Sequence, residues 1–245
     1  MIKAYAKSDK GKVRETNEDY FYISNSLDEV QLYILADGMG GYNGGEIASK
    51  LAVQTAKNYI ENNFKDIEKD KDSIIQLLGS SMEYANMVVY EKAKSTPELQ
   101  GMGTTLEICL IYNNKVYIGH VGDSRVYRIR KQFIRKLTQD HSYVQKLVKE
   151  GTITKEQAVH HPQKNMLMKA LGCNAFVEPD VMVRGFQKED SLVICSDGLS
   201  NMVSQEEIFN LVTANFETAP KELVDLANQN GGIDNTIQFC NRRKK

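Results

Sequence analysis

The sequence predicts an α+β protein in which helices pack on antiparallel sheets. Two long amphipathic segments, residues 46–62 and 73–93, lie between groups of strand-like runs. Three consecutive strand-like runs follow, and Asn113-Asn114 separates the first two, which suits a two-residue hairpin turn. Strand-like runs also lie near both ends of the chain. Strands and helices grouped in this way are typical of helices that cover antiparallel sheets.

Both long segments carry apolar residues at the spacing of one helix face. In the first, such residues recur every four positions, at Ala48, Ala52, Ala56 and Ile60. Gly44-Gly45 would begin this helix. The segment 73–93 repeats the pattern, so a second long helix is expected. Each helix needs an apolar surface to cover.

The strand-like runs 105–112, 115–122 and 125–130 predict an antiparallel meander. The chain then becomes polar and helical over residues 142–175, which interrupt the return to sheet and look like an insertion over the sheet edge. Further elements are expected as strands at 176–183 and 191–196, a helical pair at 205–228 and a last strand near Thr236.

Length and composition favour one soluble domain over residues 1–245. No Pro/Ser-rich linker divides the chain, and 245 residues is within the range of one sandwich domain. The net charge of −1 gives no global field for nucleic acid or an anionic membrane. No signal-peptide-like or membrane-spanning apolar run is present, so we expect a cytoplasmic protein. The four cysteines form neither a C-x-x-C pair nor a disulfide framework and are read as inert thiols.

Three strand-like runs end in an aspartate beside a glycine, at Asp37-Gly38, Gly122-Asp123 and Asp197-Gly198, and Asp234 follows a further glycine pair. A flanking glycine allows close backbone approach or a positive φ. Taken singly, an Asp-Gly pair is usually a turn. Taken together, these strand ends could converge on a hard cation, because gathered carboxylates need a compensating charge. Oxygen ligands select magnesium, manganese or calcium rather than zinc.

These motifs and their order resemble the metal-dependent protein phosphatases of type 2C (the PPM family), in the short bacterial form. The resemblance spans nearly the whole chain. It is carried in order by Arg14-Glu15-Thr16-Asn17-Glu18-Asp19, Asp37-Gly38-Met39-Gly40-Gly41, Gly101-Met102-Gly103-Thr104-Thr105, Gly122-Asp123-Ser124-Arg125, Ser196-Asp197-Gly198-Leu199-Ser200 and Asp234-Asn235-Thr236.

The resemblance implies a four-layer α-β-β-α sandwich of two antiparallel sheets between helix pairs, with the 142–175 insertion as a mobile flap. It also implies two manganese or magnesium ions in a cleft at one end. The expected metal ligands are Asp37, the Gly38 carbonyl, Asp197, Asp234, and Glu18 and Asp19, directly or through water. Asp37 is the expected bridging ligand and, with Arg14, a catalytic residue. The planar fork of Arg14 suits two oxygens of the substrate phosphate.

Two departures from the wider family bear on the mechanism. Met39 stands where eukaryotic relatives have a histidine, and a thioether cannot donate a proton to the leaving alkoxide. His120 and His141 lie near the motifs, although a histidine beside a strand is more often structural. Asn201 stands where many bacterial relatives have an aspartate that, with the equivalent of Asp123, binds a third ion. We therefore expect two tight ions and a weak third site at Asp123.

The sequence thus predicts a monomeric protein serine/threonine phosphatase that attacks phosphoserine and phosphothreonine with a metal-activated bridging hydroxide and opposes bacterial Ser/Thr kinases. One alternative is the related group that acts on phosphorylated anti-anti-sigma proteins, which generally lacks the Arg14 motif. Others are a phosphoprotein-binding pseudoenzyme and a calcium-stabilised module. A calcium module usually gathers its ligands in one loop rather than from segments spread along the chain.

Overall fold

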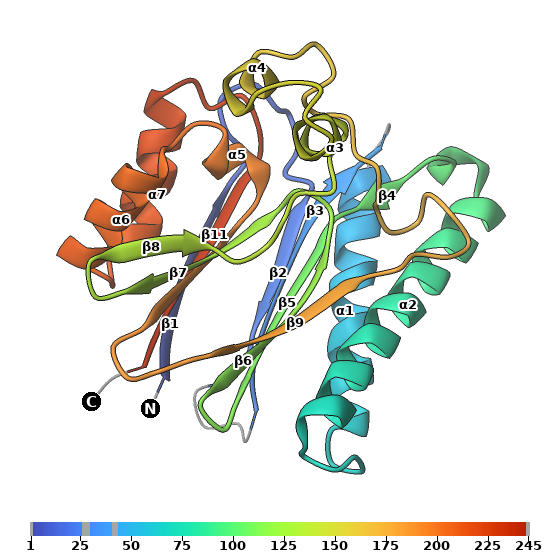
Figure 1. The fold of residues 1–245 in the computed structure, drawn as a ribbon. Coiled ribbons are helices and arrows are strands. Elements are labelled where there is room, and N and C mark those ends of the chain that lie inside the picture. Colours follow the sequence, from blue (N-terminus) through green and yellow to red (C-terminus); the bar gives the residue numbers. More distant parts are fainter. Residues whose placement is uncertain (1, 26–29, 41–43, 244–245) are drawn as a thin grey trace.

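The computed structural model describes residues 2–25, 30–40 and 44–243 and has four layers (Figure 1). One sheet has the strand order β1-β11-β10-β7-β8 and the other β2-β3-β5-β6-β9, and all described pairings are antiparallel. The strands of the first sheet are β1 (Ile2–Asp9), β7 (Arg125–Arg130), β8 (Phe133–Lys136), β10 (Ser191–Cys195) and β11 (Thr236–Arg243). Those of the second are β2 (Asp19–Ile23), β3 (Gln31–Met39), β5 (Leu106–Tyr112), β6 (Lys115–Val121) and β9 (Asp180–Gly185), with the short β4 (Gly103–Thr104) beside β3.

Helix α1 (Gly44–Asn63) and helix α2 (Lys71–Ser95) cover the second sheet, and α6 (Gln205–Ala214) and α7 (Ala219–Gln229) cover the first (Figure 1). Asp70 caps α2, because its side chain accepts hydrogen bonds from the backbone N–H groups of Asp72 and Ser73. Short elements complete the chain: η1 (Pro97–Leu99), α3 (Tyr143–Lys149), α4 (Lys155–Val159) and α5 (Asp197–Ser200). The predicted four-layer α+β fold is confirmed.

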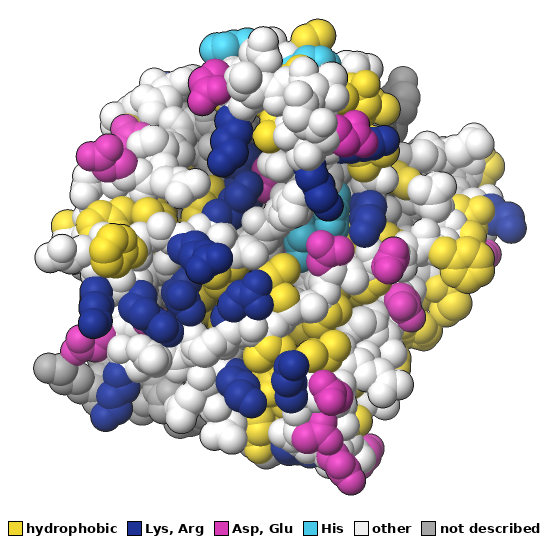
Figure 2. All heavy atoms as spheres, in the orientation of Figure 1, with side chains coloured by type: hydrophobic (Ala, Val, Ile, Leu, Met, Phe, Trp, Pro, Cys, Tyr) yellow, Lys and Arg dark blue, Asp and Glu magenta, His cyan; other side chains and the backbone are white. Residues whose placement is uncertain are grey.

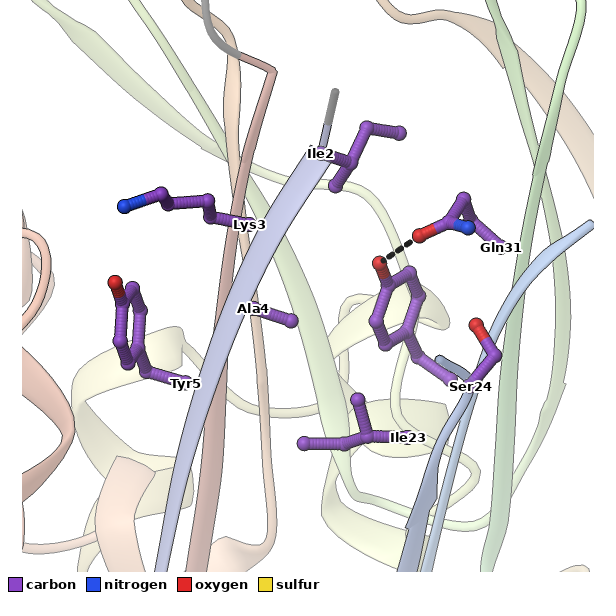
Figure 3. A pocket seen from close by; sticks show the side chains of 8 residues that line it. Ile2, Lys3, Ala4, Tyr5, Ile23, Ser24 and Gln31 are labelled. Atoms are coloured by element: carbon purple, nitrogen blue, oxygen red, sulfur yellow. Dashed lines mark hydrogen bonds between the residues drawn. The ribbon is translucent and has the colours of Figure 1, made fainter. Parts of the chain in front are cut away.

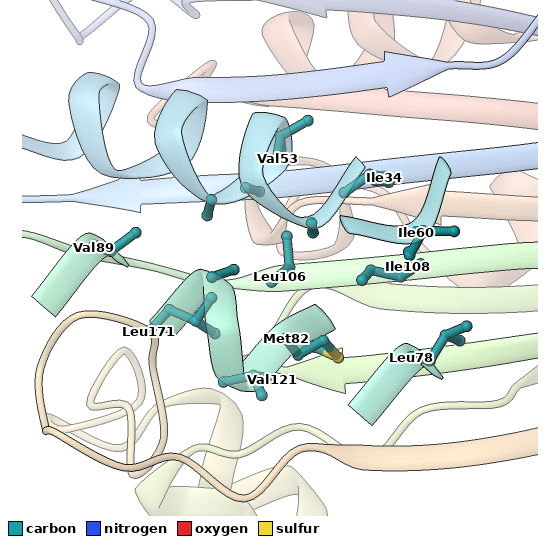
Figure 4. Packing of buried hydrophobic residues seen from close by; sticks show 14 of the residues in the cluster. Ile34, Val53, Ile60, Leu78, Met82, Val89, Leu106, Ile108, Val121 and Leu171 are labelled. Atoms are coloured by element: carbon teal, nitrogen blue, oxygen red, sulfur yellow. The ribbon is translucent and has the colours of Figure 1, made fainter. Parts of the chain in front are cut away.

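Three apolar cores hold the four layers together. Along β3, Ile34 packs in the core beneath α1 and α2 (Figure 4). Its neighbour Leu35 packs in the core between the sheets. Along β10, Ile194 lies between the sheets and Cys195 faces α6 and α7. Both faces of these strands are therefore buried. Two-sided burial explains why their sequences are continuous apolar runs rather than alternating ones.

The predicted meander is wrong at its third strand. β5 and β6 form the expected hairpin, with Asn113 and Asn114 both at positive φ, as a type I′ turn requires. The chain then leaves this sheet, because Gly122 adopts a φ of 117° and β7 pairs with β10 in the other sheet. An alternating pattern reports which residues face a core but not which sheet a strand joins.

Other boundaries differ less. α1 begins at Gly44 as predicted, and both long helices extend one or two residues beyond the periodic segments at each end. β9 starts at Asp180 rather than at residue 176, and the side chain of Phe176 is 91% exposed. Gly41, part of one motif above, lies outside the described residues. No helix in the described part of the chain combines the length and apolar character needed to cross a bilayer, and the cytoplasmic location stays a prediction.

The segment 142–175 lies at the top of Figure 1, above the strand ends, and contains α3 and α4. Ser142 caps α3, and Thr154 and Gln157 form a capping box at α4. Isolated bridges join Ser142 to Leu167 and Thr104 to Leu171. The first bridge lies within this segment, called the flap segment below, and the second anchors its later part to β4. The motion of the flap segment stays a prediction.

Two glycine substitutions in the core beneath α2 should act in opposite directions. A Cβ on Gly119 would lie 2.6 Å from Sδ of the fully buried Met82, so Gly119→Ala should lower the free energy of unfolding by about 1–3 kcal/mol. A Cβ on Gly79, inside α2, meets nothing closer than 4.0 Å. Gly79→Ala should therefore raise it by about 0.5–1 kcal/mol. Urea unfolding of both variants measures the contrast, and equal effects would contradict this packing.

Candidate metal-dependent active site

Acidic residues from four chain segments meet at one end of the sandwich. Asp37 lies near the end of β3, and Asp19, the first residue of β2, is its partner in the antiparallel register. Asp197 begins α5 directly after β10, and Asp234 lies two residues before β11. The charges of Asp19, Asp197 and Asp234 all raise the pKa of Asp37. The structure therefore brings together side chains that are up to about 200 positions apart in the sequence.

Hydrogen bonds to β4 and the start of β5 fix the backbone of Asp37. Its N–H donates to Oγ1 of Thr105 over 2.9 Å. Its carbonyl accepts from Oγ1 of Thr104 and from the N–H of Thr105, each at 2.9 Å. The motif 101–105, which the sequence alone could explain as a strand entry, thus positions this aspartate.

Gly38 and Gly198 are needed for close backbone approach rather than for a positive φ, which neither adopts. A Cβ on Gly38 would lie 2.1 Å from the carbonyl oxygen of Gly45, and one on Gly198 would lie 2.0 Å from that of Asn235. No side chain fits at such distances. Each Asp-Gly pair therefore lets a neighbouring segment pack directly against the aspartate that precedes the glycine.

Asn235 attaches the segment that carries Arg14 and Glu18 to the site. Its Oδ1 accepts from the N–H of Glu18 over 2.9 Å, and its Nδ2 donates to the carbonyls of Lys10 and Thr16 over 3.1 and 2.8 Å. Arg14 donates from Nη2 to Oδ2 of Asp234 over 2.9 Å, with half of its side chain exposed. The guanidinium therefore stands at the mouth of the acidic cluster.

Apart from the pairing of Arg14 with Asp234, the acidic cluster has little positive charge beside it. Burial and nearby acids raise the pKa of Asp19 to about 8, and burial and Asp197 raise that of Asp123 to about 7. Burial and Asp19 raise the pKa of Asp37 well above its usual range. One oxygen of Asp19 accepts from Ser196 over 2.9 Å, and the other is buried without a hydrogen-bond partner among the described residues. A bound cation would relieve both the repulsion and the unpaired oxygen.

The donor set fits hard divalent ions, because every side chain in the cluster offers oxygen. Within the residues that the structure describes, no three His, Cys, Asp or Glu side chains are grouped as the ligands of a single ion. An ion here would therefore complete its shell with backbone carbonyls and water. Magnesium commonly keeps several waters in protein sites.

Asp123 lies beside the main cluster, on the three-residue connection between β6 and β7. With Asp197 and Asn201 it lines a cleft of about 600 Å³ between the flap segment and α5. Nδ2 of Asn201 donates to Oδ2 of Asp197 over 3.1 Å. Asn201 thus occupies the predicted third-ion position with a neutral side chain that restrains Asp197.

His120 lies in the protein core and is not part of the acidic cluster. Its side chain and that of Glu107 are fully buried and hydrogen-bonded through Nδ1, and Nε2 lies 2.8 Å from the carbonyl oxygen of Gln139. The ring of His141 lies against it, with centroids 4.4 Å apart. Burial lowers the pKa of His141 to about 4. These contacts support the structural interpretation of His120.

Several supporting residues were not assigned a role from the sequence. Ser196, Thr105 and Asn235 lie inside the motifs, but their hydrogen bonds to the acidic segments have no periodic signal. Asp140 binds Arg125 through both oxygens at 2.7–3.2 Å, and Lys136 at 2.9 Å. Its only sequence signal is its place next to His141, at the start of the flap segment.

A second hollow, of about 330 Å³, opens at the opposite end of the sandwich between β1 and β2 (Figure 3). Ile2, Ala4 and Ile23 point into it, and the Tyr33 hydroxyl donates to Oε1 of Gln31 over 3.1 Å. None of its lining residues is acidic, a cysteine or a histidine. This lining lacks the carboxylate, thiolate and imidazole groups that commonly bind metal ions.

An α-β-β-α sandwich with carboxylates gathered at one end of its sheets defines the class of metal-dependent phosphatases that the sequence resembles. The chain belongs to the protein phosphatase 2C family, which residues 10–230 match. The serine/threonine phosphatase stp of Listeria monocytogenes is 36% identical over 231 residues, covering 94% of this chain and 91% of that protein.

Solved structures agree with this assignment. A serine/threonine phosphatase of S. agalactiae has a TM-score of 0.91 and 34% identity, with 100% of both chains covered. The catalytic domain of the phosphatase PstP, in complex with two manganese ions, has a TM-score of 0.87 and 32% identity over 100% of this chain and 99% of that one. The chain is thus a metal-dependent protein serine/threonine phosphatase, and its substrates are phosphoproteins.

The unneutralised carboxylates predict a distinctive pH dependence for the protein freed of divalent ions by a chelator. Asp19 has a pKa of about 8 when folded, against about 4 when unfolded. The folded state therefore binds the Asp19 proton more tightly than the unfolded state does. The resulting stabilisation of the folded state is fully present below pH 4 and is lost as the pH rises toward 8. We expect the melting temperature to fall by about 5 °C between pH 5 and pH 8, as measured by circular dichroism. Asp19→Asn should flatten this slope, and an equally steep slope in the variant would contradict the assignment.

Proposed function

We propose that the acidic end of the sandwich is where this phosphatase hydrolyses phosphoserine and phosphothreonine, with two manganese or magnesium ions bound. The observation that supports this proposal most strongly is the convergence of carboxylates from four segments of the chain, of which Asp19, Asp37 and Asp197 have pKa values raised by burial and by one another's charge or that of Asp234. The proposed ligands are Asp37, the carbonyl of Gly38, Asp197 and Asp234, with Glu18 and Asp19 acting directly or through water. PstP, solved with two manganese ions, supports this choice of metal.

Asp37, Arg14 and Met39 have different roles in the proposed reaction. When bound, the ions lower the pKa of water and offset the charge of the phosphate. Asp37 holds the centre of the site because its backbone is fixed on both sides by Thr104 and Thr105. Arg14, half-exposed beside Asp234, directs a guanidinium to the phosphate oxygens. Met39 has no proton to give, so we propose that solvent protonates the leaving alkoxide.

Four further parts of the proposal concern the setting of the reaction. The whole chain acts as one domain, the enzyme works as a monomer, and it opposes Ser/Thr kinases of bacterial type. The flap segment bounds the cleft in which Asp123 would hold a weak third ion. The relatives named as serine/threonine phosphatases support this function over the anti-anti-sigma, pseudoenzyme and calcium-module alternatives.

The site assignment is tested by phosphate release from a phosphothreonine peptide with manganese, with and without chelator. Asp37→Asn should lower kcat at least about a thousandfold, because it removes a charged ligand at the centre of the site. Wild-type and variant folding should be matched by circular dichroism. Gln100→Asn, at an exposed position outside the cluster, serves as a control that should keep full activity. Metal-dependent release that survives in Asp37→Asn would refute the assignment.

Arg14 should act mainly on substrate binding. Arg14→Ala removes a charge-assisted contact worth about 1.5–3 kcal/mol, so kcat/KM should drop about 10- to 100-fold, chiefly through KM. Arg14→Lys keeps the charge but not the planar fork, and should recover only part of the loss. Initial rates over a range of peptide concentration separate the two parameters. A pure kcat effect would exclude the binding role.

Asn201 sets the proposed affinity of the third site. Asn201→Asp adds a carboxylate beside Asp123 and removes an amide donor to Asp197, so manganese should bind there about tenfold more tightly or better. Isothermal titration of wild type should give two tight ions and one weak ion. Three equally tight ions in the wild type would overturn this view of the cleft.

A further inference from the structure

Four arginines line the gap between the edges of the two sheets, away from the acidic end. On β7, Arg128 and Arg130 alternate with Ile129, which faces the helices, so both point toward the other sheet. Arg135 is the register partner of Arg128 on β8. Arg184 on β9 follows Val183, which packs under α2, and therefore faces the same gap. Lys and Arg side chains gather over these strands in Figure 2.

This group, called the arginine patch, is short of opposing charge. Arg130 binds Asp190 through two nitrogens at 2.7 and 2.6 Å. Arg128 has no such partner: its Nη1 donates to the carbonyl of Gly185 over 3.1 Å, and its buried Nε finds no acceptor among the described residues. Burial and the other three arginines lower the pKa of Arg128, and the charge of Asp190 offsets this only in part. A bound anion would therefore pair with this positive charge and could accept a hydrogen bond from Nε of Arg128.

The patch concentrates positive charge on a chain whose net charge is only −1. Arginine presents planar donor forks that match carboxylates. Arg135 and Arg184 are exposed, whereas Arg128 and Arg130 are half-buried and point between the sheets. A flat bilayer would reach only the first two, but a single extended chain can reach all four. Since the substrates are proteins, the fitting ligand is an acidic peptide segment.

We propose that the arginine patch docks an acidic segment of the phosphoprotein substrate, apart from the phosphorylated residue. This inference rests on the proposed function of the acidic end. Asp123 and Arg128 are five residues apart along the chain, so their Cα atoms are separated by at most about 17 Å. A flexible linker of about ten residues has a similar mean span, so both parts of one substrate can bind at once.

Peptides that differ only in the docking segment test the proposal. Each carries phosphothreonine, a ten-residue Gly/Ser linker on one side, and then four glutamates or four glutamines. The enzyme variant is Arg135→Gln/Arg184→Gln, which changes exposed side chains only. Lys50→Gln/Lys92→Gln removes the same charge from exposed positions on α1 and α2 and serves as the control. Linkers are tested on both sides of the phosphothreonine.

The glutamate peptide should have a kcat/KM about fivefold higher than the glutamine peptide in wild type and in the control, at low salt. The preference should vanish in Arg135→Gln/Arg184→Gln and at about 1 M salt, where screening is nearly complete. Rates on the glutamine peptide should be the same in all three proteins. An unphosphorylated glutamate peptide should compete against the glutamate substrate only.

A second readout does not depend on turnover. Fluorescence anisotropy of the labelled, unphosphorylated glutamate peptide should show binding that the patch variant weakens about fivefold and the control does not. Equal binding of this peptide to all three proteins would overturn the proposal. So would a patch variant that loses binding to anionic vesicles when no protein prefers the glutamate peptide over the glutamine peptide. A wild type that binds this peptide but releases no phosphate would refute the function of the acidic end while leaving the docking surface standing.

Discussion

The structure depends on holding like charges together at the end of a rigid sandwich. Asp19, Asp37, Asp197 and Asp234 repel one another, and burial makes that repulsion costly. Strands that are buried on both faces supply the compensating stability. Three apolar cores fix β3 and β10 from either side, and each delivers its aspartate at the point where the apolar run stops. The rigidity of the cores and the charge of the site are therefore parts of one arrangement.

Apart from the ion pair of Arg14 with Asp234, neutral hydrogen bonds position the acidic segments. Thr105 and Ser196 are hydroxyl residues that contact Asp37 and Asp19, and Asn235 holds the Arg14 segment through three backbone groups. None of these groups adds charge to the cluster. A bound cation must therefore neutralise the carboxylates. These hydrogen bonds hold the backbone of the acidic segments in place when no cation is bound. Thr105, Ser196 and Asn235 thus fix the geometry of the site without changing its charge.

The sequence was informative wherever one local pattern determined the outcome. Helical periodicity located α1 and α2, Asn113-Asn114 located the β5–β6 hairpin, and acid-glycine strand ends located the cluster. It failed where the outcome depended on partners far along the chain. Nothing in the run 125–130 shows that β7 pairs with β10, and nothing near Ser196 shows that its hydroxyl donates to Asp19. Register within a sheet and polar pairing across it are properties of the assembled fold.

The two ends of the chain run side by side as the paired strands β1 and β11, where Ile2 is the register partner of Arg243 (Figure 1). The same pair meets the acidic end at its other extremity, because Asp9 is the register partner of Thr236. Seven residue steps of strand, about 23 Å, therefore separate Ile2 and Arg243 from the acidic end. A tether, anchor or second module joined at either end would therefore lie at the opposite end of the sandwich from the acidic cluster and would leave access to that cluster open. A short linker between the two ends would permit circular permutation at the Asn113-Asn114 turn.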